Sequence, residues 1–146
     1  MIMPRLRSAA FPLLLALALC APLAAAEKDL SKTPQAKAHE TQLKALRAGD
    51  YEGYRKTMTR AANEGIDKEI KESGMEPKKA MEFLKEMAPS DVQYTGLKVD
   101  GKKATLQATG KSFDEVNYGV IELEEEDGQW KIGQQSWTNK KEGDKK

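Results

Sequence analysis

Cysteine, histidine and aromatic residues are scarce in this chain of 146 residues, and each shortage narrows what the protein can do. The single cysteine, Cys20, lies in an N-terminal segment that we expect to be removed, so the mature protein has no thiol for disulfide bonds or thiol exchange. A small exported domain without disulfides depends on its hydrophobic core. A core is feasible here, because a chain of about 120 residues buries roughly two-thirds of its unfolded surface.

An excess of one charge is also missing. The chain has 24 basic and 23 acidic residues, and removal of residues 1–26 takes away two arginines and no acid. Because Lys and Glu are interspersed along the rest, no strong field attracts a polyanion. We therefore expect neither nucleic acid nor, after signal cleavage, a membrane surface as a partner.

A long hydrophobic run occurs only at the N-terminus. Arg5 and Arg7 precede an Ala/Leu-rich stretch, and small residues lead up to Ala26. This order is typical of a signal peptide cleaved after Ala26, which predicts a periplasmic or secreted protein. Two alternatives are an uncleaved anchor and a lipoprotein. The run is shorter than the about 20 residues of a membrane span, and Leu19 stands before Cys20 where a lipoprotein signal has Gly or Ala.

The remainder is predicted to be one domain, residues 27–138, with a polar tail, residues 139–146, that we expect to be disordered. Up to Pro89 the apolar residues recur with helical spacing. Capping residues, glycines and prolines divide this part into three expected helices, over residues 34–48, 51–73 and 77–88. The buried face of the third helix is expected to consist of Ala80, Phe83, Leu84 and Met87.

Beyond Pro89 the apolar residues alternate, which predicts antiparallel strands over residues 91–99, 103–110, 115–125 and 129–138. The pairs Asp100-Gly101 and Asp127-Gly128 are typical of hairpin turns. A change of parity around Thr95-Gly96 predicts a bulge in the first strand. In the last strand Trp130 and Ile132 share one face, whereas Trp137 falls at the opposite parity.

Helices followed by a strand meander predict an α+β domain, with N-terminal helices packed on a curved antiparallel sheet of about four strands. The order of elements, the Gly49-Asp50 step, residues 100–104 and above all residues 126–132 (EDGQWKI) resemble the nuclear transport factor 2-like superfamily. The small exported bacterial members of unknown function are the most similar. The resemblance implies a cone-like fold with a pocket between helices and sheet, but no particular reaction, because members include enzymes as well as binding and dimerising modules.

Residues suited to catalysis are few. The superfamily's isomerases and dehydratases have an acid or histidine base inside the cone. Glu122 shares the parity of Val120 and is the one carboxylate that could face inward, with Tyr94 or Tyr118 supplying a hydroxyl. A glutamate in the middle of a strand is more often solvated. His39, the sole histidine, is more often packed on a helix face than catalytic or metal-bound.

Cofactor sites are not indicated either. The acidic run over residues 124–127 points to alternate faces and enters a turn, so a solvated loop is favoured over a calcium site. The glycines are scattered at caps and turns and do not form a phosphate-binding loop. We therefore expect no metal and no other cofactor.

Aromatic and methionine side chains provide the candidate ligand site. Their simplest role is to form the core. The alternative is a cavity for a small apolar or aromatic ligand, lined by Tyr54, Met58, Tyr94, Tyr118 and Trp130.

Three functions stay open. The favoured one is a non-catalytic periplasmic binding or interaction module of unknown ligand. A cone-pocket isomerase or hydratase would require a buried Glu122. A dimerising structural partner in the cell envelope would pair its exposed sheet face with a second copy, and that face was expected to include Gln107, Thr109, Gln135 and Trp137.

Overall fold

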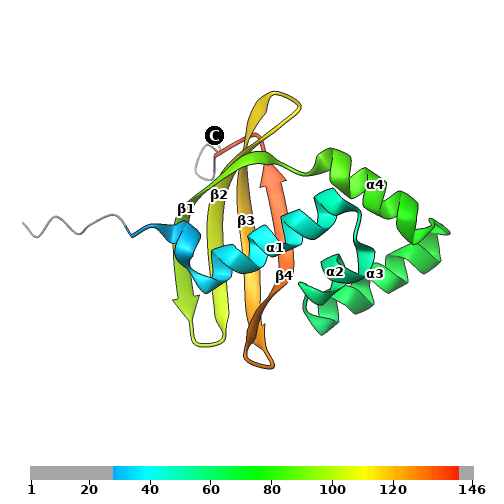
Figure 1. Ribbon diagram of the computed structural model, residues 1–146, viewed down its shortest axis with the longest axis horizontal. Helices are drawn as coiled ribbons and strands as arrows, with labels where there is room; N and C mark the ends of the chain where they lie inside the picture. Colours follow the sequence, from blue (N-terminus) through cyan, green and yellow to red (C-terminus); the bar gives the residue numbers. More distant parts are fainter. Residues whose placement is uncertain (1–27, 142–146) are drawn as a thin grey trace, which may run out of the picture.

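The computed structural model describes residues 28–141, in which four α-helices and a short 3-10 helix precede a four-stranded sheet (Figure 1). The predicted signal peptide, Cys20 and the last five residues lie outside the described residues. Within the described part, no helix has the length and apolar character needed to cross a membrane. The predicted α+β architecture, helices packed on a curved antiparallel sheet, is confirmed.

The first helices follow their capping signals. The 3-10 helix η1 (Leu30–Lys32) leads into α1 (Pro34–Ala48), whose N-cap Thr33 accepts a hydrogen bond from the Ala36 amide at 3.2 Å. Gly49, at a φ of 68°, ends α1 in the left-handed conformation that favours glycine. Asp50 then caps the next helix by accepting from the Gly53 amide at 2.8 Å.

The predicted long helix over residues 51–73 is wrong, because the structure has two helices there. They are α2 (Tyr51–Lys56) and α3 (Arg60–Ser73). The intervening residues pair with the last strand: the Ile132 amide donates to the Thr57 carbonyl, and the Thr59 amide donates to the Ile132 carbonyl, both at 2.9 Å. These backbone bonds replace two helical ones, and Thr59 also caps α3.

The sheet is an antiparallel meander in the order β1-β2-β3-β4. Its strands are β1 (Ser90–Asp100), β2 (Lys103–Ser112), β3 (Glu115–Glu126) and β4 (Gln129–Thr138). Both hairpins are present. Asp100 pairs with Lys103, so the first turn is Gly101-Lys102, one residue later than expected. Asp127 and Gly128 both have positive φ, as the predicted tight turn requires.

Bulges decide which side chains face the helices. The predicted bulge in β1 lies between Tyr94 and Gly96. A second bulge, which was not predicted, lies in β4: the register shifts between Glu122 and Leu123, and Gly133 is the extra residue. The parity of β4 therefore reverses after Gly133. Gln135 and Trp137 lie on the helix-covered face, and their expected outward direction was wrong.

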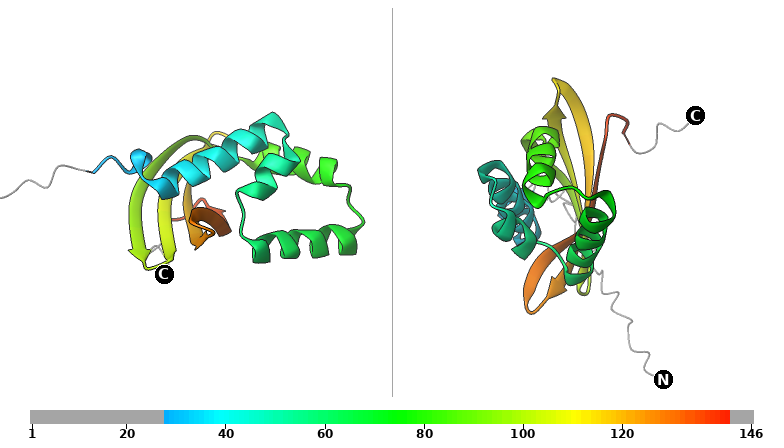
Figure 2. Two further views of the ribbon diagram at one scale, coloured as in Figure 1. Left: turned by 60° about the horizontal axis from the view of Figure 1, so that its bottom comes forward. Right: turned by 90° about the vertical axis from the view of Figure 1, so that its right-hand side faces the viewer.

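Helix α1 lies across one face of the curved sheet, which we call the inner face (Figures 1 and 2). The core beneath it includes Leu106, Ile121 and Ile132, all fully buried. A smaller apolar cluster, centred on Leu46, Tyr54 and Met81, joins α1 and α2 to the start of α4. The opposite face of the sheet, the outer face, is largely free of helices, and only the start of α3 borders it, beside Glu122 and Gln134 (Figure 2).

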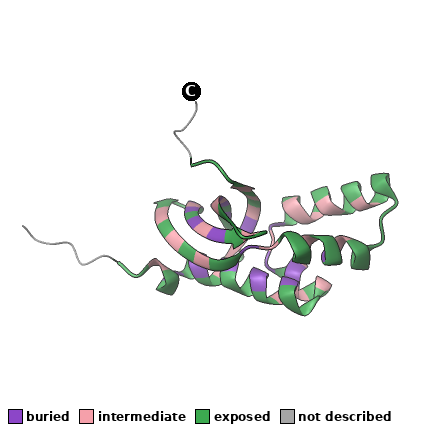
Figure 3. Cartoon of the chain, turned by 90° about the horizontal axis from the view of Figure 1, so that it is seen from above, coloured by how far each residue is buried: buried purple, intermediate pink, exposed green. Residues whose placement is uncertain are grey.

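Helices α3 and α4 (Pro77–Met87) extend from this body as an arm (Figure 2). No residue of α3 is buried, and in α4 only Met81 is (Figure 3). Phe83 and Met87, expected in the buried face, are 59% and 48% exposed. The reason is that α4 contacts α1 and α2 through its Met81 side. Helix α3 reaches the smaller apolar cluster through Ile66 and leaves Phe83 and Met87 exposed.

Candidate ligand-binding site

The five residues of the predicted ligand site do not lie together. Tyr54 and Met58 belong to the smaller apolar cluster, while Tyr94 and Trp130 pack against the main core. Tyr118 lies on the outer face, because its neighbour Gly119 faces inward. The ligand-binding role of these residues stays a prediction, but they do not line one common cavity.

Instead, the inner face holds a polar cluster that sequence reasoning missed. It consists of His39 and Gln42 from α1, Tyr94 from β1, and Gln135 and Trp137 from β4, and we call it the His39 cluster. His39 and Gln42 are both fully buried. The Tyr94 hydroxyl lies 3.1 Å from His39 Nδ1 and donates to the Ala36 carbonyl at 3.3 Å.

Glycines in the sheet make room for Trp137. Its ring stacks on the His39 imidazole, with ring centres 6.1 Å apart and an angle of 26° between the planes. A β-carbon added at Gly119 would lie 2.7 Å from this indole, and one at Gly110 would lie 3.3 Å from it. Such approaches are closer than van der Waals contact, so the sheet is shaped to hold the indole against His39.

Several buried polar atoms of the cluster have no hydrogen-bond partner. These are His39 Nε2, both amide atoms of Gln42 and Gln135 Oε1, although the Gln135 side chain lies close enough to His39 to affect its pKa by hydrogen bonding. An unsatisfied buried donor or acceptor costs about 1–3 kcal/mol, so native proteins rarely keep several in one place. Water or a ligand with polar groups would supply the missing partners.

The cluster is uncharged at neutral pH. Burial lowers the pKa of His39 to about 4, with the neighbouring Gln135 amide opposing the shift and the Arg47 charge adding to it. Burial is also the main cause that raises the pKa of Tyr94. A neutral imidazole and a neutral phenol both donate and accept hydrogen bonds, which suits them to hold a polar but uncharged group.

The carboxylate considered for catalysis is not inside. Glu122 is exposed and lies on the outer face, since Ile121 and Leu123 on either side of it are buried against the helices. The expectation that it could face inward was therefore wrong. Among residues 28–141, no three His, Asp or Glu side chains come together as they would to hold a metal ion.

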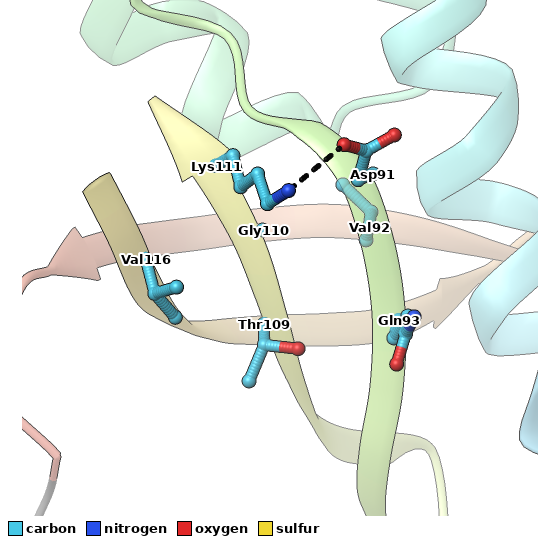
Figure 4. A pocket seen from close by; sticks show the side chains of 7 residues that line it. All are labelled: Asp91, Val92, Gln93, Thr109, Gly110, Lys111 and Val116. Carbon is cyan, nitrogen blue, oxygen red and sulfur yellow. Dashed lines mark ion pairs between the residues drawn. The ribbon is translucent and has the colours of Figure 1, made fainter. Parts of the chain in front are cut away.

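Two of the surface hollows bear on binding. One, of about 420 Å³, lies where β1 begins and β2 ends, beside the ion pair of Asp91 and Lys111 at 3.7 Å (Figure 4). The other, of about 550 Å³, lies between α1, α2 and the β3–β4 turn, with Trp130 in its lining, and we call it the Trp130 groove.

No family model and no curated protein matches the chain. The solved structures that are similar to it are NTF-2-like proteins. One, of unknown function, from Shewanella oneidensis MR-1, is 13% identical with a TM-score of 0.45, over 71% of this chain and 95% of that one.

A second NTF-2-like protein of unknown function, from Burkholderia xenovorans LB400, is 13% identical with a TM-score of 0.44. The match covers 78% of this chain and 90% of that one. Likenesses at this level identify neither a ligand nor an activity for this chain.

A signal for the His39 cluster was present in the sequence. Gly133 lies in the middle of the last strand, and a glycine in a strand often marks a bulge. A bulge there brings Gln135 and Trp137 to the same face as Ile132. Together with His39 and Gln42, one turn apart on α1, this would have indicated a polar cluster under the first helix.

Proposed function

We propose that this protein is a non-catalytic binding module of the bacterial cell envelope, and that its ligand binds at the His39 cluster. The observation that carries the proposal is the set of fully buried, uncharged hydrogen-bonding groups without partners between α1 and the sheet. A ligand that satisfies them gains hydrogen bonds in a site already removed from water. The N-terminal segment, typical of a signal peptide, supports export to the periplasm.

The lining favours a small neutral ligand with a flat apolar part. Gln42 and Gln135 offer amide donors and acceptors, and His39 offers one ring nitrogen. The Trp137 indole and the Tyr94 ring, both half-buried, provide aromatic surfaces at the side of the cluster that reaches solvent. A charged ligand is disfavoured, because the site has no buried counter-charge.

Binding is favoured over the isomerase or hydratase alternative. A general base that works near neutral pH needs a pKa near that pH. His39, with a pKa of about 4, is a weak base, and Glu122 is exposed on the outer face.

A thermal-shift screen of the purified full chain against neutral periplasmic metabolites, lipids and cell-wall fragments tests the proposal. A ligand at 100 times its dissociation constant stabilises by about 2.7 kcal/mol, which is a shift of several degrees. The decisive variant is Gln42→Leu/Gln135→Leu, with Gln107→Leu/Gln134→Leu on the outer face as the matched control.

The two variants separate a binding role from a structural one. For a binding site, the inner pair of substitutions leaves the unliganded protein as stable or more stable, because unsatisfied polar atoms disappear, yet abolishes the ligand-induced shift. The control keeps the shift. The proposal would be overturned if Gln42→Leu/Gln135→Leu were less stable than the wild type and no compound in the screen raised the melting temperature of the wild type.

The second candidate function is that of a dimerising partner, and the observation that favours it is the composition of the outer face. The centre of that face is uncharged, although 32% of the chain is charged. Register places the following residues there: Gln93, Gln107, Thr109, Tyr118, Val120, Ser136 and Thr138. Depletion of charge at the centre of a patch is typical of interfaces. Of the four residues expected on this face, Gln107 and Thr109 remain, whereas Gln135 and Trp137 lie inside.

Sedimentation at increasing concentration tests this second candidate. A dimer through the outer face should be broken by Val120→Lys but not by Val99→Lys, since Val99 is already 50% exposed near the β1–β2 turn. A protein that stays monomeric at high concentration would exclude a stable dimer.

A further inference from the structure

We propose that the Trp130 groove is a second binding site, for a monomeric anionic amphiphile: a carboxylate with a short alkyl or aryl body. The groove lies on the side of α1 toward α2 and the β3–β4 turn, and none of the His39 cluster lines it. Its volume of about 550 Å³ lies within the range of small-molecule sites, about 300–1,000 Å³.

The floor of the groove is apolar. Trp130, half-buried, packs against the main core and lines the groove together with Pro34 and Ala38 of α1. An indole beside a proline ring and a methyl group provides a surface on which an alkyl chain or an aromatic ring loses water. The body of the proposed ligand lies on this surface.

The rim of the groove is basic. Lys37 of α1, Lys56 of α2 and Lys131 of β4 line it, and none of the described lining residues is acidic. The Lys131 ammonium donates to the Lys56 carbonyl, which holds it at the rim beside α2. An ammonium group has three donors, so Lys131 keeps donors for a ligand.

These three lysines are distinguished by lining one hollow together. The absence of an ion pair is shared with most other lysines of residues 28–141. Lys103 and Lys111 each have a carboxylate 3.7 Å away, from Glu124 and Asp91 respectively. Within residues 28–141, no ion pair is formed by Lys37, Lys56 or Lys131. Glu124, opposite Lys131 in the register, pairs with Lys103. Three positive charges around one apolar hollow therefore form no ion pair, and a ligand carboxylate would provide one.

The shape of the site favours a single molecule over a membrane surface. A ligand that enters the groove must leave the bilayer, whereas a protein that binds a membrane by charge presents its lysines on a flat or convex face. Here the lysines surround a hollow whose apolar floor lies against the core.

Isothermal titration of the full chain with octanoate tests the proposal. The comparison compounds are 1-octanol and octylammonium, which have the same chain length but no charge or a positive charge. We expect octanoate to bind, and the neutral and cationic analogues to bind about fivefold more weakly or not at all. Lys37→Gln/Lys56→Gln/Lys131→Gln should weaken octanoate binding by about tenfold, and raising the salt concentration should weaken it in the wild type.

The matched control is Lys71→Gln/Lys79→Gln/Lys98→Gln, which removes the same charge elsewhere on the surface and should change the affinity by less than about twofold. Equal affinity for octanoate and octanol, or an unchanged affinity in the groove variant, would overturn the proposal. The proposal would also be overturned if Gln42→Leu/Gln135→Leu lost octanoate binding while the triple lysine variant kept it, because the ligand would then lie in the His39 cluster. Anionic vesicles that bind better than octanoate would indicate a membrane and contradict a monomeric ligand.

Discussion

In the body formed by α1 and the sheet, Leu106, Ile121 and Ile132 are fully buried, whereas α3, a helix of 14 residues, has no buried residue at all. Both regions consist of regular elements, and in each the first helix has a side-chain N-cap, Thr33 for α1 and Thr59 for α3. What differs is the source of their stability. The body is stabilised mainly by burial of apolar surface. Helix α3 depends on its caps, on surface ion pairs such as that of Arg55 with Asp67, and on the half-buried Ile66.

This contrast shows that regular structure and burial need not go together. Thr59 caps the start of α3 and Gly74 ends it in the left-handed conformation. The Arg60 amide at its first turn donates to the Glu126 carboxylate at 3.2 Å. An isolated helix of this length is marginal in water, so we expect the arm to open locally far more often than the body.

Truncating one isoleucine in each region gives the largest expected difference. Ile121→Ala removes a fully buried side chain from the core and should lower the free energy of unfolding by about 4 kcal/mol. Ile70→Ala, in the half-buried stripe of α3, should cost less than about 1 kcal/mol. Urea denaturation measures both, and similar losses would mean that the arm shares the core.

Acidification should weaken the body through His39. Its pKa is about 4 in the folded protein and 6.5 as the ordinary value, so the unfolded chain binds the proton more readily. The stabilising effect of keeping His39 neutral is thus full above about pH 6.5 and is lost as the pH falls toward 4, by about 3 kcal/mol in all.

Comparison with His39→Leu isolates this effect from that of the carboxylates. The variant should lack the His39 part of the slope between pH 6.5 and 4, and denaturation at several pH values measures the difference. Parallel pH profiles for wild type and variant would contradict a buried neutral imidazole.

Replacing a glycine by alanine should lower the stability of the protein in the body and raise it in the arm. Gly119→Ala puts a methyl group 2.7 Å from the Trp137 ring and should cost about 2 kcal/mol. At Gly65, in α3, an added β-carbon meets nothing within 4 Å, so Gly65→Ala should stabilise by up to about 1 kcal/mol. The melting temperatures check both, and a loss at Gly65 would show that α3 packs against another surface.

Removing a cap should affect the arm alone. In Thr59→Ala, α3 loses the hydrogen bond from the Ala62 amide at 3.1 Å, worth about 1 kcal/mol. Amide exchange in α3 should therefore speed up by about fivefold. Exchange in β2 and β3 is the internal control and should hardly change. Equal acceleration in both regions would contradict their independence.

Local signals predicted the parts of the fold that local chemistry determines. The ends of α1, both hairpins and the β1 bulge follow from Thr33, Gly49, the Asp-Gly pairs and the parity change near Gly96. The break between α2 and α3 did not follow, because it depends on backbone bonds to Ile132, about 75 residues further along the chain.

The candidate site was less predictable than the fold, because one residue reversed a whole strand end. When Gly133 is treated as an ordinary strand position, the alternation predicts that Gln135 and Trp137 face outward, so the polar cluster around His39 is not predicted. Tyr94 was predicted to line one site with Trp130, which packs against the same core, and with Tyr54, Met58 and Tyr118, which do not. The outward Phe83 was missed for a related reason: a helical stripe does not reveal whether another element covers it.

The chain has two tryptophans, and each belongs to a different candidate site: Trp137 stacks on His39, and Trp130 lines the groove beside α2. Each site therefore contains its own fluorophore, and no label is needed. In Trp130→Phe the emission comes from the indole next to the imidazole, and in Trp137→Phe from the indole between the lysines. Two single-tryptophan proteins would thus report separately, by quenching or a spectral shift, which of the two sites an added molecule occupies.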